Sequence, residues 1–319
     1  MNNLIQTILY NFIPSINRFF GRNKKFNNLL IYYCSNFSLS GGLTDRLKGI
    51  MTAYQLSLAT KREFKIIFNK PFKIKKILDQ NIINWKIDSE NKEKRILSVA
   101  KHYNFINETN KDQVIKNIKN IIDDKNNVLA LRINQDYIKI INNMNLIREK
   151  SWNDCFNDLF KFTEFTQKAL DKFLELHDWD RVIGVHCRFL NLLGDNLESG
   201  EELSSGNKNI LIGKILKSLY DLLSDSPKCR ILLCSDSMIF LDIIKKENVL
   251  KDNLVIVEGE PKHSERQHVS DQNLEKIIID FFLLSECYKI FSITYNKMYP
   301  SAFPKYSAKI KNREFIIIS

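Results

Sequence analysis

Three groups of residues have the types and spacing that bind charged or polar ligands. The first is His186 and Arg188, at the end of the apolar run VIGVHCRF. Side chains alternate along a strand, so both point to the same side. A guanidinium offers phosphate oxygens a planar, charge-assisted grip, and a histidine can donate to the same group. The pair indicates an anion site; the alternative is a buried histidine beside an arginine paired with a carboxylate such as Asp195.

The second group is Ser235, Asp236 and Ser237, which follows the apolar run RILLC. A carboxylate in this position can accept two parallel N–H bonds from the edge of a guanine base, and the hydroxyls can bond ribose or phosphate. An equally ordinary role for Asp236 or Ser237 is to cap the next helix. The sequence leaves both roles open.

The third group is the segment GGLTDR, which contains Gly41, Gly42, Asp45 and Arg46. Glycines let the backbone approach a ligand closely, and a helix that begins here presents free N–H groups and the positive end of its dipole. A plain turn also explains the glycines. Arg46 favours an anion site, because a cation in the first turn of a helix is disfavoured unless something negative lies nearby.

The hydrophobic pattern predicts the elements that carry these groups. In the first half it predicts strands at 27–35, 63–68 and 127–134, with a helix at 43–58. The segment from about 150 to 177 reads as helical. In the second half, strands and helices alternate at 181–189, 209–223, 229–237, 238–247, 253–259 and 271–287.

Short apolar strands between amphipathic helices indicate parallel sheets covered on both faces. We therefore predict an α/β fold with two Rossmann-like domains facing a cleft, over residues 1–165 and 166–319. In open α/β sheets ligands bind beyond the carboxyl ends of the strands, where all three groups lie.

Composition limits the function classes. The 319 residues are 44% hydrophobic and 27% charged, which excludes a disordered chain. The longest apolar runs fall far short of the roughly 20 residues of a membrane span. Six scattered cysteines without a CxxC pair predict reduced thiols and a cytoplasmic protein. A net charge of +11 favours anionic partners, but no nucleic-acid-binding motif is present, so we expect no nucleic acid.

The first 21 residues lack the pattern of a signal peptide. Their apolar side chains, with Arg18 and Arg22 nearby, fit a peripheral contact with an anionic membrane surface, here the inner face of a cell membrane. The alternative is a helix packed on its own domain.

The three groups resemble the motifs of a known family. GGLTDRLKGIMTAYQLSLAT is similar to the GGLGDRLRGI-type opening of the GDP-fucose transferases, which include nodulation, plant cell-wall and core fucosyltransferases. VIGVHCRF resembles their HxR motif, ILLCSDS their second motif and IIIDFFLLSECYKIFSITYNKMYPSA their last one. The order and spacing agree over residues 41–302.

The resemblance implies a GT-B-like fold whose second domain binds the nucleotide-sugar donor and whose first domain lies on the acceptor side. By position, Arg188 would bind the donor diphosphate, His186 would support it and Asp236 would read the guanine. The expected donor contacts also include Ser237, Asn296 and, closing the cleft from the first domain, Gly41, Gly42, Asp45 and Arg46.

Two departures from the family leave the sugar and the catalytic base open. Asn296-Lys297-Met298-Tyr299 replaces Ser-x-Phe-Ser, and Phe189-Leu190-Asn191 replaces the charged residues that often follow HxR. We expect Asp195 to be the base that takes the acceptor proton, with Glu198 as the second candidate, because both lie in the polar loop after the HxR strand. The literal Asp-x-Asp at 178–180 precedes that strand, so we expect no metal.

The resemblance thus implies an inverting, metal-independent bacterial fucosyltransferase that uses GDP-fucose as donor and a surface glycan or glycolipid as acceptor in polysaccharide biosynthesis. A second interpretation keeps the fold with another GDP-sugar or an activated phosphoryl donor. A third is a catalytically silent protein that binds a nucleotide sugar or glycan.

Overall fold

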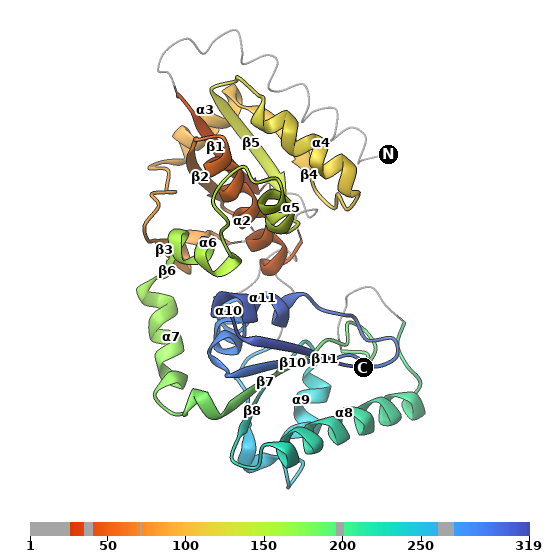
Figure 1. Cartoon of the computed structure of the whole chain (residues 1–319). Coiled ribbons are helices and arrows are strands. Elements are labelled where there is room, and N and C mark those ends of the chain that lie inside the picture. Colours follow the sequence, from red (N-terminus) through yellow and green to blue (C-terminus); the bar gives the residue numbers. More distant parts are fainter. Residues whose placement is uncertain (1–25, 35–40, 71, 196–200, 261–270) are drawn as a thin grey trace. The chain divides into compact units, whose positions relative to one another are not determined.

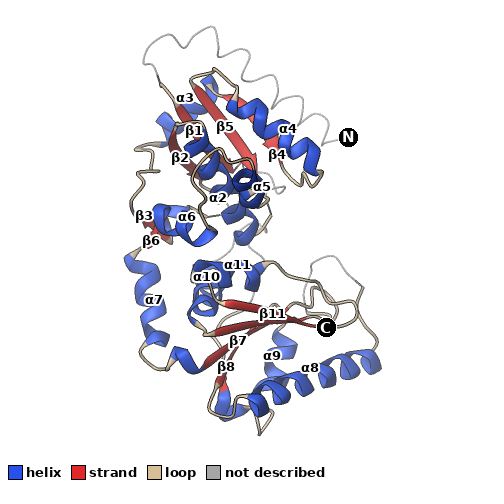
Figure 2. Cartoon of the chain, in the orientation of Figure 1, coloured by secondary structure: helices blue, strands red, loops and turns tan. Residues whose placement is uncertain are grey.

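The computed structural model describes residues 26–34, 41–70, 72–195, 201–260 and 271–319. The chain divides into two compact units, each built on one parallel sheet with helices packed against it (Figures 1 and 2). The first unit comprises Met1–Ile74 and Asp79–Lys161, and the second comprises Lys75–Leu78 and Phe162–Ser319. The predicted α/β class is confirmed. The predicted N-terminal membrane contact lies outside the described residues.

The sheet of the first unit has the strand order β2-β1-β5-β4, with all neighbours parallel. Its strands are β1 (Leu29–Cys34), β2 (Glu63–Phe68), β4 (Lys101–Phe105) and β5 (Val128–Ile133). β1, β2 and β5 confirm the three strands predicted from alternation and apolar runs.

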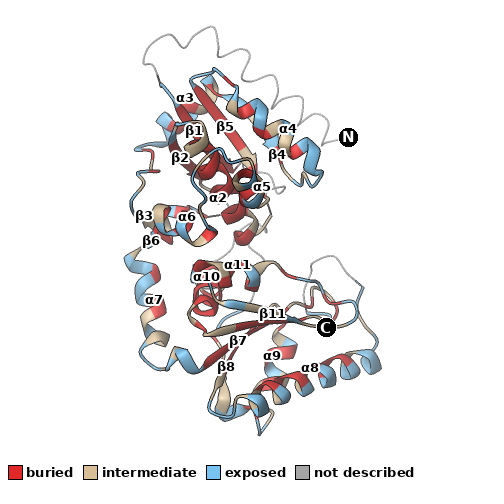
Figure 3. Cartoon of the chain, viewed as in Figure 1, coloured by how far each residue is buried: buried red, intermediate tan, exposed pale blue. Residues whose placement is uncertain are grey.

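Helix α2 is the central helix of the first unit, and most of its residues are buried (Figure 3). It spans Leu43–Ala59 and contacts β1 and β5 as well as three helices, α4 (Lys111–Ile122), α5 (Ile138–Asn143) and α6 (Trp152–Leu159). Helix α3 (Glu90–Val99) contributes Ile96 to a separate apolar cluster with β1. Gly49 permits the close packing of α2, because a Cβ there would lie 1.9 Å from the carbonyl oxygen of Ile133.

The segment predicted as helical over about 150–177 contains two helices separated by a short strand. Helix α6 ends where β6 (Phe160–Phe162) begins, and α7 (Glu164–Leu174) follows. β6 pairs with β3 (Leu78–Gln80), where the chain passes between the units. The break has a local cause: Thr163 caps α7 by accepting the N–H of Thr166.

The sheet of the second unit has the order β11-β10-β7-β8-β9, again all parallel. Its strands are β7 (Val182–Cys187), β8 (Arg230–Ser235), β9 (Leu254–Val255), β10 (Lys289–Ile293) and β11 (Glu314–Ile318). The order reverses between β7 and β10, which is the doubly wound arrangement of a dinucleotide-binding sheet. The sequence pattern predicted β7 and β8, overestimated the length of β9, and missed β10 and β11.

Helices cover both faces of this sheet (Figure 1). Helices α8 (Ser205–Asp225) and α9 (Met238–Lys245) lie on one face, and α10 (Asp271–Glu286) and α11 (Phe303–Ile310) lie on the other. Val185 and Cys187 of β7 belong to the apolar core under α8 and α9. Because side chains alternate along β7, His186 faces α10 and α11 instead.

Replacing Gly49 with alanine should destabilise the first unit. Alanine normally favours a helix over glycine, but here its methyl group would overlap the end of β5, so we expect a loss of about 2 kcal/mol in the free energy of unfolding. Gly213 in α8 is the matched control, since a Cβ there meets nothing within 4 Å, and Gly213→Ala should stabilise by about 0.5–1 kcal/mol. Urea unfolding of both variants measures the difference. A Gly49→Ala protein as stable as Gly213→Ala would contradict the packing.

Candidate functional site

The candidate site lies at the carboxyl ends of β7 and β10, where the strand order of the second unit reverses. The two strands are in register there, with His186 beside Ser292 and Cys187 beside Ile293. Arg188 directly follows β7. Of the three groups singled out in the sequence, two therefore meet at this edge, because β8 pairs with the other side of β7 and carries Asp236 just beyond its end.

Arg188 contacts a carboxylate and an aromatic ring. Its Nε lies 3.9 Å from Oδ2 of Asp236, and its Cζ lies 5.3 Å from the centroid of the Tyr299 ring. The side chain of Arg188 is 19% exposed, so the guanidinium is reachable from solvent while much of it is covered. A partly desolvated guanidinium at a strand-order reversal is a suitable group for binding a phosphate or diphosphate.

Asp236 fixes the turn that follows Arg188. Its Oδ1 accepts the N–H of Phe189 at 2.8 Å, and its Oδ2 accepts the N–H of Leu190 at 2.9 Å. Leu190 has a φ of 53°, in the left-handed region that a leucine rarely adopts. The two charge-assisted hydrogen bonds stabilise this turn. Asp236 thus has a structural role beside the guanine contact predicted for it, and that contact stays a prediction.

Ser237 and Asp195 together cap helix α9. The Ser237 hydroxyl accepts the N–H of Phe240 at 3.1 Å and donates to Oδ2 of Asp195 at 2.8 Å. The same oxygen of Asp195 accepts the N–H of Ile239 at 2.9 Å. The capping role considered for Ser237 is confirmed, and the suggested partner of Arg188 was wrong: the carboxylate near the arginine is Asp236. Asp195 is exposed, and its carboxylate is tied to the N-terminus of α9.

Two further predicted site residues are less informative. Glu198, the second candidate for the base, lies outside the described residues. Asn296 is exposed, with a φ of 52°, in the turn after β10. Asparagine tolerates the left-handed conformation better than most residues, so its observed role is to form this turn.

His186 is a buried, neutral imidazole. Burial, together with the positive charge of Arg188, lowers its pKa to about 3. Its ring lies 5.3 Å from the ring of Phe303 in α11, and its Nδ1 has no hydrogen-bond partner among the described residues. A buried polar atom without a partner is unusual in folded proteins. His186 therefore has one buried ring nitrogen whose hydrogen-bonding capacity no described residue satisfies.

The predicted anion site of the first unit is organised around Arg46, which is only 3% exposed. Its Nε donates to the carbonyl oxygen of Gly41 at 3.0 Å, and its Nη1 donates to the carbonyl oxygen of Lys70 at 2.8 Å and contacts Cys34 Sγ. Carbonyl oxygens thus supply the negative partner that a cation in the first helical turn requires. Gly41, with a φ of 75°, forms the bend before α2.

The other two residues of this segment also have internal roles. Asp45 forms an ion pair with Lys48 at 2.6 Å, and Gly42 is the N-cap residue of α2. In the described part of this segment, the residues form the turn before α2 and hold it through a hydrogen bond and an ion pair. The ligand contacts predicted for these residues stay predictions.

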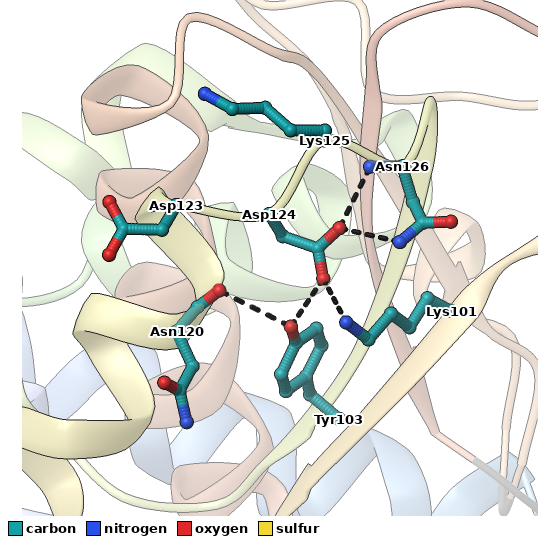
Figure 4. A pocket seen from close by; sticks show the side chains of 7 residues that line it. All are labelled: Lys101, Tyr103, Asn120, Asp123, Asp124, Lys125 and Asn126. Carbon is teal, nitrogen blue, oxygen red and sulfur yellow. Dashed lines mark hydrogen bonds and ion pairs between the residues drawn. The ribbon is translucent and has the colours of Figure 1, made fainter.

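A hollow of about 550 Å³ lies in the first unit where β4 and β5 begin, at the other end of the sheet from Arg46 (Figure 4). At its centre Asp124 accepts hydrogen bonds from Lys101, Tyr103 and Asn126. Burial alone would raise the pKa of Asp124, but these hydrogen bonds lower it. Because the charges pair with one another, this hollow is a weaker candidate than the edge at Arg188.

The described residues contain no group of three or more His, Cys, Asp and Glu side chains arranged to hold a metal ion. The Asp-x-Asp at 178–180 forms a short turn before β7, at the edge of the sheet away from Arg188, where Asp178 lies 3.5 Å from Arg181. Within the described parts of the chain, no helix has the length and apolar character that crossing a membrane requires.

Sequence reasoning missed two aromatic residues at the site, Tyr299 and Phe303. Both follow β10, which the hydrophobic pattern did not predict. An aromatic side chain does not by itself mark a site residue in a sequence. Recognition of β10 as the neighbour of β7 would have placed the residues after it beside Arg188.

No family model matches the sequence, and no curated protein matches it. The structure does match solved structures. The α-1,6-fucosyltransferase NodZ soaked with GDP-fucose is 16% identical, with a TM-score of 0.58 over 89% of this chain and 92% of that chain. A mutant of FUT1 from Arabidopsis thaliana in complex with GDP is 10% identical, with a TM-score of 0.60 over 97% of this chain and 73% of that chain. POFUT1 in complex with GDP-fucose is 10% identical, with a TM-score of 0.52 over 94% and 99%.

The chain has the fold of these fucosyltransferases. The match extends over both units, and the family resemblance of the sequence motifs agrees with it. At 10–16% identity the match establishes the fold alone.

Arg46→Ala should destabilise the protein. Two carbonyl oxygens would lose a charged donor, so we expect a loss of about 2–3 kcal/mol in the free energy of unfolding. Arg181 is the matched control, because its side chain is 63% exposed and Arg181→Ala should change stability by less than about 0.5 kcal/mol. Urea unfolding measures the free energy of unfolding of both variants. Unchanged stability of Arg46→Ala would favour the ligand contact predicted from sequence.

His186 should make the protein less stable in acid. The folded state holds the imidazole neutral down to about pH 3, while the unfolded chain protonates it below about pH 6.5. The unfolded state therefore binds more protons in this window, and stability falls as pH falls. His186→Gln should make the slope of unfolding free energy between pH 6 and 4 shallower by about 1.4 kcal/mol per pH unit. Identical slopes in the two proteins would show that the histidine is protonated in the fold.

Proposed function

We propose that this protein is a glycosyltransferase that moves fucose from GDP-fucose to a hydroxyl group of an acceptor. The observation that carries the proposal is the position of Arg188: a partly covered guanidinium at the strand-order reversal of the second unit. The fold is shared with fucosyltransferases whose structures were determined with GDP or GDP-fucose, which supports a guanine nucleotide as the ligand.

The reaction requires charge stabilisation on the leaving group. The acceptor oxygen forms a bond to the anomeric carbon as the bond from that carbon to the diphosphate oxygen breaks, and negative charge accumulates on the diphosphate. A preorganised cation that contacts this charge lowers the barrier. Arg188 is the residue proposed for that task, which needs no metal ion. His186, being neutral, can hydrogen-bond the same group without adding charge.

The base that takes the acceptor proton is the less defined part of the proposal. Inversion requires a base on the side of the acceptor, and Asp195 remains the candidate with Glu198 as the second. Asp195 accepts two hydrogen bonds at the start of α9, both on Oδ2, so its other oxygen, Oδ1, is the one proposed to take the proton of the acceptor hydroxyl.

The replacement of the charged residues after HxR by Phe189-Leu190-Asn191 favours an alternative, a protein that binds the nucleotide sugar without transferring it. The proposal for the acceptor, a surface glycan or its lipid-linked precursor at the inner face of a bacterial membrane, rests on the family resemblance and on the sequence composition. Another GDP-sugar as donor fits the same site.

The guanine assignment can be tested by nucleotide titration. We expect the wild-type protein to bind GDP at least tenfold more tightly than UDP, a difference of about 1.4 kcal/mol, because a site that accepts from both N1–H and the amino group of guanine meets a single donor, N3–H, flanked by carbonyl oxygens in uracil. Isothermal titration calorimetry gives both dissociation constants. Equal affinities would refute a guanine-specific donor site. Incubating GDP-fucose with glycan acceptors, with release of GDP as the readout, then separates a transferase from a binding protein.

Arg188→Ala should abolish transfer and weaken GDP binding by roughly 2 to 4 kcal/mol, the scale for losing a desolvated charge-assisted contact. Arg181→Ala removes the same charge at the opposite edge of the sheet and should leave GDP affinity within twofold. Calorimetry measures affinity, and the melting temperature verifies folding. If the folded Arg188→Ala protein bound GDP as the wild type does, the diphosphate would have to bind elsewhere.

A further inference from the structure

We propose that Tyr299 is a positioning residue that holds the Arg188 guanidinium in its ligand-binding orientation. The inference rests on the proposed function, and it concerns a position where the family resemblance fails: Tyr299 ends the Asn-Lys-Met-Tyr segment that replaces Ser-x-Phe-Ser. The replacement puts a large aromatic side chain beside the arginine.

Tyr299 contacts Arg188 at both ends of the arginine. The Tyr299 N–H donates to the carbonyl oxygen of Arg188 at 3.3 Å, and the Tyr299 ring centroid lies 5.3 Å from the guanidinium carbon. A cation over the face of a tyrosine ring is attracted by the quadrupole of the ring, and arginine can also stack on it. The two contacts join the segment after β10 to the residue after β7, across the strand-order reversal.

The turn that delivers Tyr299 is itself anchored. Met298 is 4% exposed and belongs to the core under α8 and α9. Its N–H donates to the carbonyl oxygen of Tyr295 at 2.9 Å, and Asn296 adopts the left-handed conformation that closes the turn. Tyr295 is fixed in turn, because its hydroxyl hydrogen-bonds the hydroxyl of Ser218 at 2.7 Å. The backbone of Tyr299 therefore starts from a rigid point.

The Tyr299 side chain is placed to act on the arginine more than on the core. Tyr299 is 50% exposed, so its ring contributes little buried apolar surface to folding. Asp236 holds the backbone after Arg188 and lies 3.9 Å from its Nε, which fixes the base of the side chain. The ring then restricts the remaining rotation of a long, flexible side chain. An arginine that is ordered before the ligand arrives loses less conformational entropy on binding.

Four proteins test the proposal: wild type, Tyr299→Leu, Arg188→Ala and the double variant. We expect Tyr299→Leu to weaken GDP binding about fivefold, while Tyr299→Phe, which keeps the ring, stays within twofold of wild type. In the Arg188→Ala background, Tyr299→Leu should change the GDP dissociation constant less than twofold, because the ring acts only through the arginine. Ligand-observed NMR reaches the millimolar dissociation constants expected for the Arg188→Ala proteins.

A second measurement needs no nucleotide. In protein labelled with ¹⁵N-arginine, the heteronuclear NOE of the Arg188 Nε–Hε group, whose signal is identified by its loss in Arg188→Ala, should fall when the ring is removed in Tyr299→Leu and stay at the wild-type value in Tyr299→Phe. An unchanged heteronuclear NOE in Tyr299→Leu overturns the proposal. A fivefold loss of GDP affinity on Tyr299→Leu that persists in the Arg188→Ala background also overturns the proposal, because the ring would then contact the ligand itself. Wild-type protein that does not bind GDP would overturn the proposed function instead, and the NMR signal would still decide whether Tyr299 holds the arginine.

Discussion

The site depends on one carboxylate. Asp236 stands just beyond β8, and it accepts two backbone N–H groups from the turn beyond β7. Without those bonds, the left-handed conformation of Leu190, with a φ of 53°, would be unfavourable for a leucine. The bonds therefore fix the direction in which the chain leaves β7, and with it the place of Arg188. The same carboxylate lies close enough to the guanidinium to offset part of its charge.

Arg46 of the first unit and Arg188 of the second unit are held by different kinds of partner. In the first unit, Arg46 donates to carbonyl oxygens of the protein, and this cross-link holds the bend before α2. In the second unit, Arg188 is held beside a carboxylate and a ring, next to a buried imidazole nitrogen with no described partner. A cation that serves the fold is saturated by hydrogen bonds to the backbone. Arg188 is instead held at a strand-order reversal by a carboxylate and an aromatic ring, the kind of preorganisation that a ligand-binding group requires.

The sequence predicted the elements whose pattern is local. β7 and β8 are short apolar runs with clear ends, and α2 follows a glycine pair, so all three were predicted near their true bounds. β10 was missed because KIFSI directly follows the long apolar run of α10, and β6 was missed because three residues show no period. The partners of Asp195 and Asp236 could not be predicted, since each carboxylate suited a helix cap, an ion pair or a ligand equally well. Only the register of β7, β8 and β10 decides which groups meet.

The most direct test of the account is a crystal structure of the protein with GDP. The account predicts that the diphosphate binds beyond the carboxyl ends of β7 and β10, in contact with the Arg188 guanidinium, while both oxygens of Asp236 keep their bonds to Phe189 and Leu190. A diphosphate bound away from Arg188, or an Asp236 carboxylate that has left those two N–H groups to bind the ligand, would contradict it.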